Sequence, residues 1–262
     1  MDINFTQSMI FPKRSYTIWF SQRNGSTLLC EGLAATGVAG KPGEHLLLPP
    51  ETSLLEQYEA EDHRSLQRRL WQRGLTDNGV FGIKCNAPRK EDDAIMRELA
   101  RMVGLAPSAG NVQIWEKAFP NGKHIFLTRR HKLRQAVSWW KAIVTNEWHR
   151  RSGQQRNYDP AAIRERYDFA ALRHLLLEIS LRESKIQAFL DEGAIVPLTV
   201  AYEDLIREYE TTIRRVIDFL DIDAADYEVT PPALLRQADA LSDEWTERFR
   251  RELQRDWPVV IW

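Results

Sequence analysis

The stretch WFSQRNGSTLLCEGLAATGV, residues 19–38, decides how this chain folds. It begins as an apolar strand, breaks into a polar loop over residues 21–25 and resumes as an amphipathic helix. A helix that starts directly after a strand presents unpaired backbone N–H groups and the positive end of its dipole. We therefore predict an anion site here, although a plain turn with a serine cap is the alternative. The predicted anion-binding residues are Arg23, Asn24, Gly25, Ser26, Thr27 and Leu28.

Strand and helix patterns alternate along the rest of the chain. Strands are predicted at residues 16–20, 79–85, 123–129 and 194–205. Helices are predicted at 25–36, 54–73 and 92–103, and after the third strand. Such alternation is typical of an α/β fold, in three layers, with a central parallel sheet flanked by helices. We expect one domain over residues 1–262, and the arginine-rich stretch 147–165 can be a loop, a lid or an interface arm.

The predicted strands end in polar residues. Ligands of parallel sheets bind beyond the carboxyl ends of the strands, because neighbouring ends meet at one edge of the sheet. The polar segments at these ends are Ser21–Ser26, Cys85–Asn86 and Arg129–Arg130. The sequence therefore predicts a single site that draws on three strands.

The composition argues against several kinds of partner. Lys and Arg number 36 against 37 Asp and Glu, so the formal charge of −1 gives no reason to expect nucleic acid. No apolar run reaches the roughly 18 residues of a membrane span, so we expect no stable membrane insertion. The two cysteines fit buried free thiols and the first residues resemble no leader, which favours a cytoplasmic protein. The spacing of His, Cys and Asp predicts no metal.

The loop lacks the lysine of nucleotide triphosphatases, whose pattern is GxxxxGK[ST]; here Gly25 is followed directly by Ser26. The segment SQRNGSTLL (21–29) resembles the 5′-phosphosulfate loop of sulfotransferases, P-loop-like proteins that use 3′-phosphoadenosine 5′-phosphosulfate (PAPS). The continuation EGLAATGVAGKPGEHL (31–46) is similar to the bacterial trehalose 2-sulfotransferase family. Further matches follow in the family's order: NGVFGIK (78–84), RQAVSWWKA (134–142), AYEDL (201–205) with IDFLDI (217–222), and RQADALSDEWTERFRREL (236–253).

The resemblance implies roles for the residues of the donor site. Arg23 would hold the 5′-phosphate and the bridging oxygen, and Arg129 with Ser138 would bind the 3′-phosphate. Nine residues of continuous helix would separate that pair by roughly 13 Å, so the helix has to start late. Arg130 departs from the family's proline and offers a competing guanidinium. The segment that closes over the nucleotide contributes Arg236 and Gln237.

A sugar hydroxyl needs a base that takes its proton during transfer. Animal and plant sulfotransferases carry a histidine after the second strand, but here that strand ends IKCNAP. The resemblance places Glu44 at the family's catalytic glutamate, while a glutamate favoured by a helix dipole is the alternative reading. His45 is the second choice. Lys84 either anchors substrate or extends from the edge of the sheet towards water.

The sequence thus predicts a PAPS-dependent sulfotransferase acting on a carbohydrate hydroxyl by in-line displacement, with Glu44 and Arg23 as catalytic residues. The acceptor would be a trehalose-like disaccharide, a glycolipid or a polysaccharide precursor, and the resemblance implies a homodimer. A P-loop-like nucleotide kinase is the alternative, since it shares the strand, loop and helix. A nucleotide-binding protein without catalytic activity is another.

Overall fold

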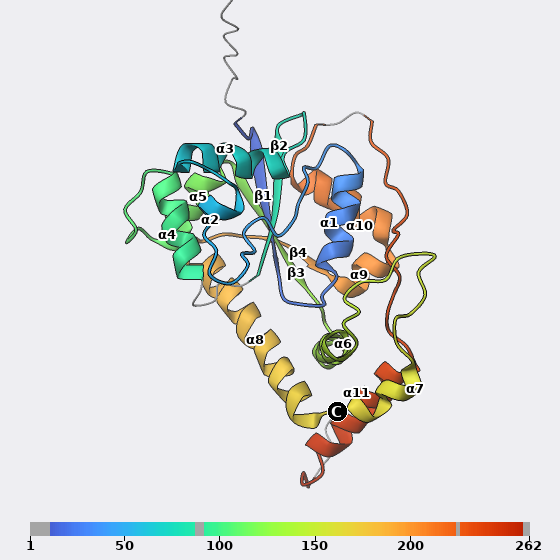
Figure 1. The fold of residues 1–262 in the computed structure, drawn as a ribbon. Helices are drawn as coiled ribbons and strands as arrows, with labels where there is room; N and C mark the ends of the chain where they lie inside the picture. The colour runs from blue at the N-terminus through green and yellow to red at the C-terminus, as the bar shows by residue number, and fades with distance from the viewer. Residues whose placement is uncertain (1–10, 87–91, 224–225, 259–262) are drawn as a thin grey trace, which may run out of the picture.

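A parallel sheet of four strands forms the centre of the molecule (Figure 1). The computed structural model describes residues 11–86, 92–223 and 226–258. The strands are β1 (Arg14–Phe20), β2 (Val80–Asn86), β3 (Gly122–Thr128) and β4 (Leu198–Ala201). Their order is β2-β1-β3-β4, with every neighbouring pair parallel. The predicted α/β fold with a central parallel sheet is confirmed. The N-terminal residues that we read as lacking a leader lie outside the described ranges.

Helices cover both faces of this sheet because alternate strand residues point to opposite sides. Tyr16 and Ile18 of β1 belong to a core shared with α1 (Ser26–Ala35) and α10 (Tyr209–Phe219). Trp19 belongs to the opposite core. That core is formed with α2 (Leu54–Gln57), α3 (His63–Gly74), α4 (Asp92–Met102) and α5 (Asn111–Ala118).

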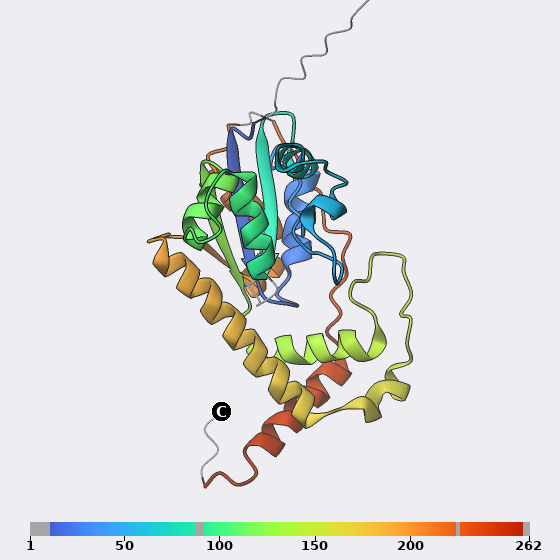
Figure 2. The ribbon, with the colours of Figure 1, turned by 60° about the vertical axis from the view of Figure 1, so that its left-hand side comes forward.

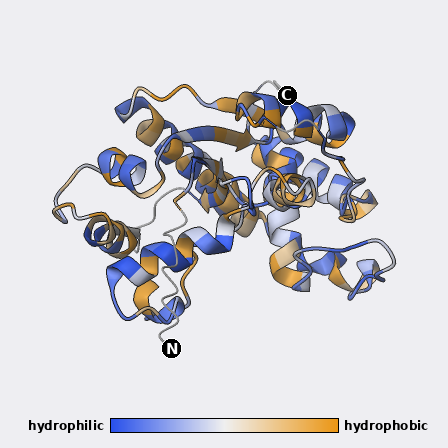
Figure 3. Cartoon of the chain, turned by 90° about the horizontal axis from the view of Figure 1, so that it is seen from above, coloured by the Kyte–Doolittle hydropathy of each residue, from blue (hydrophilic) through white to orange (hydrophobic). Residues whose placement is uncertain are grey.

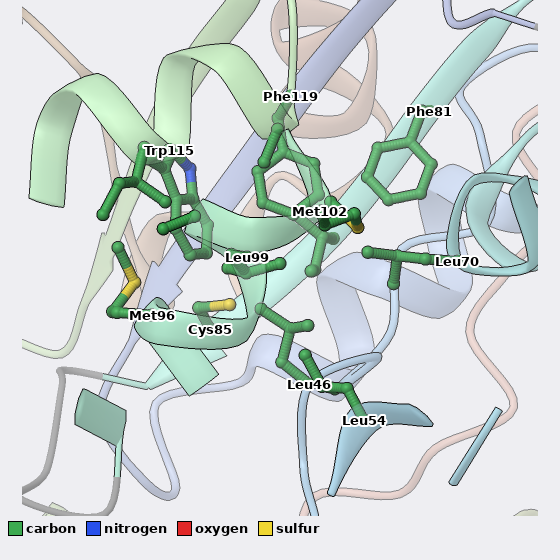
Figure 4. Close-up of a cluster of buried hydrophobic side chains, with 14 of the residues drawn as sticks. Leu46, Leu54, Leu70, Phe81, Cys85, Met96, Leu99, Met102, Trp115 and Phe119 are labelled. Atoms are coloured by element: carbon green, nitrogen blue, oxygen red, sulfur yellow. The ribbon is translucent and has the colours of Figure 1, made fainter. Parts of the chain in front are cut away.

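Part of the core over α2 to α5 is drawn in Figure 4, where Leu70, Leu99 and Phe81 pack between the helices and the sheet. Each of these side chains is fully buried. Burial of one such side chain contributes roughly 1.5–3 kcal/mol. In Figure 3 the hydrophobic residues gather on the central strands and on the inner sides of the helices. The site therefore rests on a rigid sheet packed on both faces.

A helical layer lies beyond the carboxyl ends of the strands (Figures 1 and 2). It consists of α6 (Lys132–Thr145), α8 (Phe169–Glu192) and α11 (Ala240–Leu253), with α7 (Pro160–Ile163) and a 3-10 turn at Arg164–Arg166 beside them. Val137, Leu172 and Trp245, one from each long helix, share a small core. This layer closes the space in front of the strand ends.

Two sequence predictions of secondary structure were wrong in detail. The predicted strand 194–205 is β4 alone, and the chain turns at once into α9 (Tyr202–Arg207). The carboxylate of Glu203 accepts hydrogen bonds from the backbone N–H groups of Arg130 and His131, at 3.0 and 3.2 Å, which holds the first turn of α9 against the end of β3. The predicted helix 54–73 is two helices, because Asp62 caps α3 by accepting from the backbone of Ser65 at 2.7 Å.

The sequence left the role of residues 147–165 undecided. Their first residues form part of a strap over the strand ends. We use "strap" for residues 147–152 together with 233–237, which pair in antiparallel fashion. Ser152 donates its backbone N–H to the carbonyl of Ala233, and Leu235 donates to that of Arg150, both at 2.8 Å. An ion pair between Arg151 and Glu31 of α1 fastens the strap. Within the described ranges no helix is long and apolar enough to cross a membrane.

Candidate active site

The loop between β1 and α1 has the backbone of an anion cradle. Gly25, the residue before α1, has φ 89°, and a Cβ there would lie 2.7 Å from Cδ2 of Tyr202. Only glycine fits both conditions. Because Gly25 also has no side chain with which to cap α1, the first N–H groups of the helix stay free for a ligand. Arg23 is left-handed as well, with φ 63°, which costs backbone energy in a non-glycine residue.

Side chains from β3 and α6 hold the loop from below. Asn24 is fully buried and donates from Nδ2 to the carbonyl of Leu127 at 2.6 Å. Gln135 of α6 donates from Nε2 to Oγ of Ser21 and to the carbonyl of Gln22, at 2.8 and 2.7 Å. Of the predicted loop residues, Asn24 therefore anchors the loop with its side chain, which faces β3 and does not line the cavity described below.

A carboxylate that the sequence analysis missed joins this anchor. Glu183 of α8 accepts hydrogen bonds from Ser21 at 3.0 Å, from Thr128 at 3.2 Å and from the ammonium of Lys132 at 2.6 Å. It connects the loop, the end of β3 and the start of α6. No local pattern marks Glu183, because it lies 162 residues from Ser21 in the chain.

Arg23 points across the cradle towards α6 and the strap. Its Nε donates to Oγ of Ser138 at 3.2 Å, and its two terminal nitrogens donate to the carbonyl of Trp148 and to Oε1 of Gln237. Burial, with the nearby charge of Arg129 as the second cause, lowers the pKa of Arg23 to about 10. The guanidinium is thus held in a poorly solvated place beside a second cation.

Arg129, the residue after β3, is the second cation. It is 8% exposed, donates from Nη1 to the carbonyl of Arg23 at 3.2 Å and stacks 4.5 Å from the ring centroid of Tyr202. Burial lowers the pKa of Arg129. Its buried Nε has no hydrogen-bond partner among the residues that the structure describes. An anion between the two arginines would satisfy this donor and relieve the repulsion.

The two arginines open into one cavity of about 620 Å³. Every predicted site residue except Asn24 lines it: Arg23, Gly25, Ser26, Thr27, Leu28, Glu44, Arg129, Ser138, Arg236 and Gln237. Ser138 reaches the cavity although α6 starts early, at Lys132, because the helix crosses in front of the strand ends. Tyr202, Lys141 and His149 also line it and were not predicted.

Two residues that the sequence left in competition lie outside the cavity. Arg130 makes a bidentate ion pair with Asp204 on the exposed side of α9. His45 is 7% exposed and donates from Nε2 to the carbonyl of Lys41 at 2.9 Å. Its ring faces Phe81 at 6.1 Å between centroids, and burial lowers its pKa. The structure therefore separates His45, the second choice for the base, from the residues that meet in the cavity.

Glu44 and Lys84 form an ion pair at the other end of the cavity. Nζ of Lys84 lies 2.9 Å from Oε1 of Glu44, donates to Oγ1 of Thr27 at 3.2 Å and lies 5.0 Å from the centroid of the Phe20 ring. The backbone N–H of Lys84 donates to the carbonyl of Gly43 at 2.9 Å, which lays the loop with Glu44 along the edge strand β2. Lys84 thus joins the carboxylate to α1, the helix after the phosphate loop. Glu44 does not lie at the start of a helix, so the alternative of a glutamate favoured by a helix dipole does not apply.

The strap covers the remaining side. Gln237 donates from Nε2 to the Oε1 of Glu147 at 3.1 Å, and Lys141 donates to the carbonyl of Gln237 at 2.9 Å and pairs with Asp239 at 2.8 Å. These bonds join α6 to both segments of the strap. In the described part of the chain, no group of three or more His, Cys, Asp or Glu side chains is arranged to hold a metal ion.

Fold and site together define a class: a phosphate-loop α/β protein that lacks the lysine of nucleotide triphosphatases and presents one half-buried and one buried arginine to a single cavity. The model of one family, described as Stf0 sulphotransferase, matches residues 15–252. The chain therefore belongs to the Stf0 sulphotransferase family and is a sulfotransferase. Family membership decides against the kinase alternative.

Two relatives named trehalose 2-sulfotransferase are similar in sequence to this chain over almost its whole length. A trehalose 2-sulfotransferase of Mycolicibacterium smegmatis is 30% identical over 280 aligned positions, covering 92% of this chain and 96% of the relative. A trehalose 2-sulfotransferase of Mycobacterium tuberculosis is 29% identical, with the same two coverages of 92% and 96%. Among solved structures, a sulfotransferase from Alicyclobacillus acidocaldarius is similar, with a TM-score of 0.47 and 15% identity over 93% of this chain and 94% of that one.

Proposed function

We propose that the protein transfers a sulfuryl group from PAPS to a hydroxyl group of a carbohydrate, giving a sulfate ester and adenosine 3′,5′-bisphosphate. The observation that carries this proposal is the meeting of Arg23 and Arg129 at one cavity, at the ends of two neighbouring strands. A nucleotide with phosphate groups at two positions of its ribose can pair one phosphate with each arginine. The unpartnered Nε of Arg129 supports an anion at this place.

The donor site would divide between the two arginines. The free N–H groups at the start of α1, with Thr27 and Arg23, suit the 5′-phosphosulfate. Arg129 and Ser138 suit the 3′-phosphate, and Arg236 and Gln237 of the strap suit the nucleoside. PAPS supplies an activated sulfuryl group whose leaving oxygen gains negative charge during transfer. Arg23 would stabilise that charge.

Glu44 is the proposed base. A carboxylate that accepts the hydroxyl proton as the new bond forms accelerates transfer by about 10²- to 10⁴-fold. Lys84, 2.9 Å away, pairs with the carboxylate and fixes its orientation. Because Lys84 also donates to Thr27, it holds the base at a fixed place relative to the phosphate loop. By analogy with phosphoryl transfer, such positioning and charge stabilisation account for most of the catalysis.

The acceptor is proposed from the relatives. Two similar proteins are named trehalose 2-sulfotransferases, so a trehalose-like disaccharide is the first choice. A glycolipid or a polysaccharide precursor keeps the same hydroxyl chemistry. We further propose a single catalytic domain over the whole chain that acts as a cytoplasmic homodimer; light scattering of the full chain would test the dimer.

Calorimetry tests the donor site. We expect adenosine 3′,5′-bisphosphate to bind, and ATP with Mg²⁺ to bind at least tenfold more weakly, because only the bisphosphate places an anion at Arg129. Tight binding of ATP without binding of the bisphosphate would contradict the proposal. The second step is transfer of labelled sulfate from PAPS to trehalose, other disaccharides and glycolipids. Binding without any transfer would indicate a protein that binds the nucleotide but does not catalyse.

A further inference from the structure

Asn86, the last residue of β2, faces the end of the cavity that holds Glu44 and Lys84. Along β2 the side chains alternate: Phe81, Ile83 and Cys85 enter the core over α2 to α5. Lys84 and Asn86 therefore point to the opposite side, towards the loop with Glu44. Asn86 lines the same cavity as these two residues.

The amide of Asn86 has an unused acceptor. Its Oδ1 is buried and has no hydrogen-bond partner within the ranges that the structure describes. Buried polar atoms in native proteins are nearly all paired, and an unpaired one calls for an explanation such as a missing ligand. An amide offers an acceptor oxygen and two donor hydrogens, a combination that matches the hydroxyl groups of a sugar. The orphaned oxygen therefore indicates a ligand that donates a hydrogen bond.

The position of Asn86 separates it from the nucleotide. β2 is an edge strand of the sheet, and β1 lies between it and β3, whose end carries Arg129. Two strand spacings place the ends of β2 and β3 roughly 10 Å apart. Asn86 pairs in register with Phe20, which also lines the cavity and lies beside Lys84. Its neighbours thus belong to the end of the cavity with the proposed base.

We propose that Asn86 is a specificity-determining residue that holds the carbohydrate acceptor. Its Oδ1 accepts a hydrogen bond from one hydroxyl group, and its Nδ2 donates to the oxygen of an adjacent one. This pair of bonds selects a vicinal diol over a lone alcohol and turns one hydroxyl towards Glu44. The inference rests on the proposed function and names the acceptor class as a polyhydroxylated ring.

The test compares Asn86→Ala with the matched control Asn111→Ala, an exposed asparagine at the start of α5. We expect Asn86→Ala to raise the KM for trehalose by roughly 10- to 100-fold, because two hydrogen bonds to the acceptor are lost. The KM for PAPS and the affinity for adenosine 3′,5′-bisphosphate should stay within twofold. The control should change none of these values.

Deoxy acceptors identify the contact. With the wild-type protein, monodeoxy trehaloses that lack a hydroxyl held by Asn86 should be poorer acceptors than trehalose. In Asn86→Ala this penalty should vanish for those analogues and persist for the others. Binding of trehalose to the dead-end complex with adenosine 3′,5′-bisphosphate, followed by NMR, gives the same comparison without turnover.

Thermal unfolding separates this role from a structural one. Removal of an unpaired amide should leave the Tm of Asn86→Ala unchanged or raise it, whereas loss of a structural hydrogen bond would lower it. An unchanged acceptor KM, an equal loss of bisphosphate affinity, or one penalty for every deoxy analogue would overturn the inference while the proposed function stands. Absence of transfer by the wild-type protein to any acceptor would overturn both.

Discussion

The two ends of the cavity are built in different ways. At the arginine end, Arg129 directly follows β3, and the loop that carries Arg23 is held by several side-chain hydrogen bonds to β3, α6 and α8. At the carboxylate end, Glu44 lies in a loop without regular structure and depends on one ion pair with Lys84. The arginine end is thus held by a network of hydrogen bonds, whereas the position of the Glu44 carboxylate depends on one ion pair. We therefore expect substitutions at the carboxylate end to abolish sulfuryl transfer without weakening the binding of the donor nucleotide.

The largest effect is expected from Glu44→Gln. The amide cannot accept the proton, so kcat should fall by about 10²- to 10⁴-fold. Affinity for adenosine 3′,5′-bisphosphate should stay within twofold, because the arginine end is unchanged. Steady-state kinetics and calorimetry measure the two quantities, and Glu61→Gln, at an exposed residue, is the control. If the two ends depend on each other, the bisphosphate affinity will fall together with kcat.

The variant Arg129→Gln tests the arginine end of the cavity. The variant loses the charge-assisted bonds to the proposed 3′-phosphate, each worth roughly 1.5–3 kcal/mol, so bisphosphate affinity should fall about 100-fold. Arg130→Gln is the matched control, since Arg130 pairs with Asp204 outside the cavity. Calorimetry compares the two variants. A loss in Arg130→Gln alone would mean that the adjacent guanidinium, and not the buried one, holds the nucleotide.

Acid should weaken the fold through a buried histidine of β3. His124 of β3 is buried and accepts a hydrogen bond from Nε1 of Trp19 at 2.9 Å, and burial lowers its pKa to about 4. The pKa of histidine in the unfolded chain is near 6.5. Between pH 6.5 and pH 4, His124 is therefore protonated in the unfolded chain but stays neutral in the folded chain. The free energy of unfolding should therefore fall as the pH drops through this window, by about 3 kcal/mol at most, and level off below it.

The matched variant for this effect is His124→Asn, whose amide oxygen can still accept from Trp19 but does not titrate. Urea unfolding at several pH values between 4 and 7 should show a flatter profile for the variant than for the wild-type protein. Identical slopes would assign the acid sensitivity to other groups. His45, whose pKa burial also lowers, is one of these.

The smallest effect concerns the support of the loop. Glu183→Gln keeps the size of the side chain but removes the charge opposite Lys132, so the loop should lose roughly 1–2 kcal/mol of its anchoring. We expect bisphosphate affinity to fall about 5- to 30-fold, with kcat at saturating donor changed less. The control is Glu210→Gln, whose ion pair with Arg214 is on the surface. A loss of kcat without loss of bisphosphate affinity would mean that Glu183 supports Glu44 and Lys84 and not the phosphate loop.

Much of the arginine end could be read from the sequence, because strand ends are recognised from local patterns. The strand before Arg23 and the helix after Gly25 follow from hydrophobic periodicity, and a parallel sheet brings strand ends to one edge. The side chain of Asn24 escaped this reasoning: an asparagine beside a glycine has the same local pattern whether it binds a ligand or the carbonyl of Leu127. The pairing of the two strap segments escaped as well, since neither carries a strand pattern.

The sequence by itself determined the parallel α/β fold, the phosphate loop and the family, because hydrophobic periodicity and short motifs are local properties of the chain. Only the tertiary structure decided which residues meet. Lys84 contacts Thr27 across 57 residues, and Arg23 reaches Gln237 across 214. Such contacts depend on the path of the whole chain around the sheet, and no local pattern records that path.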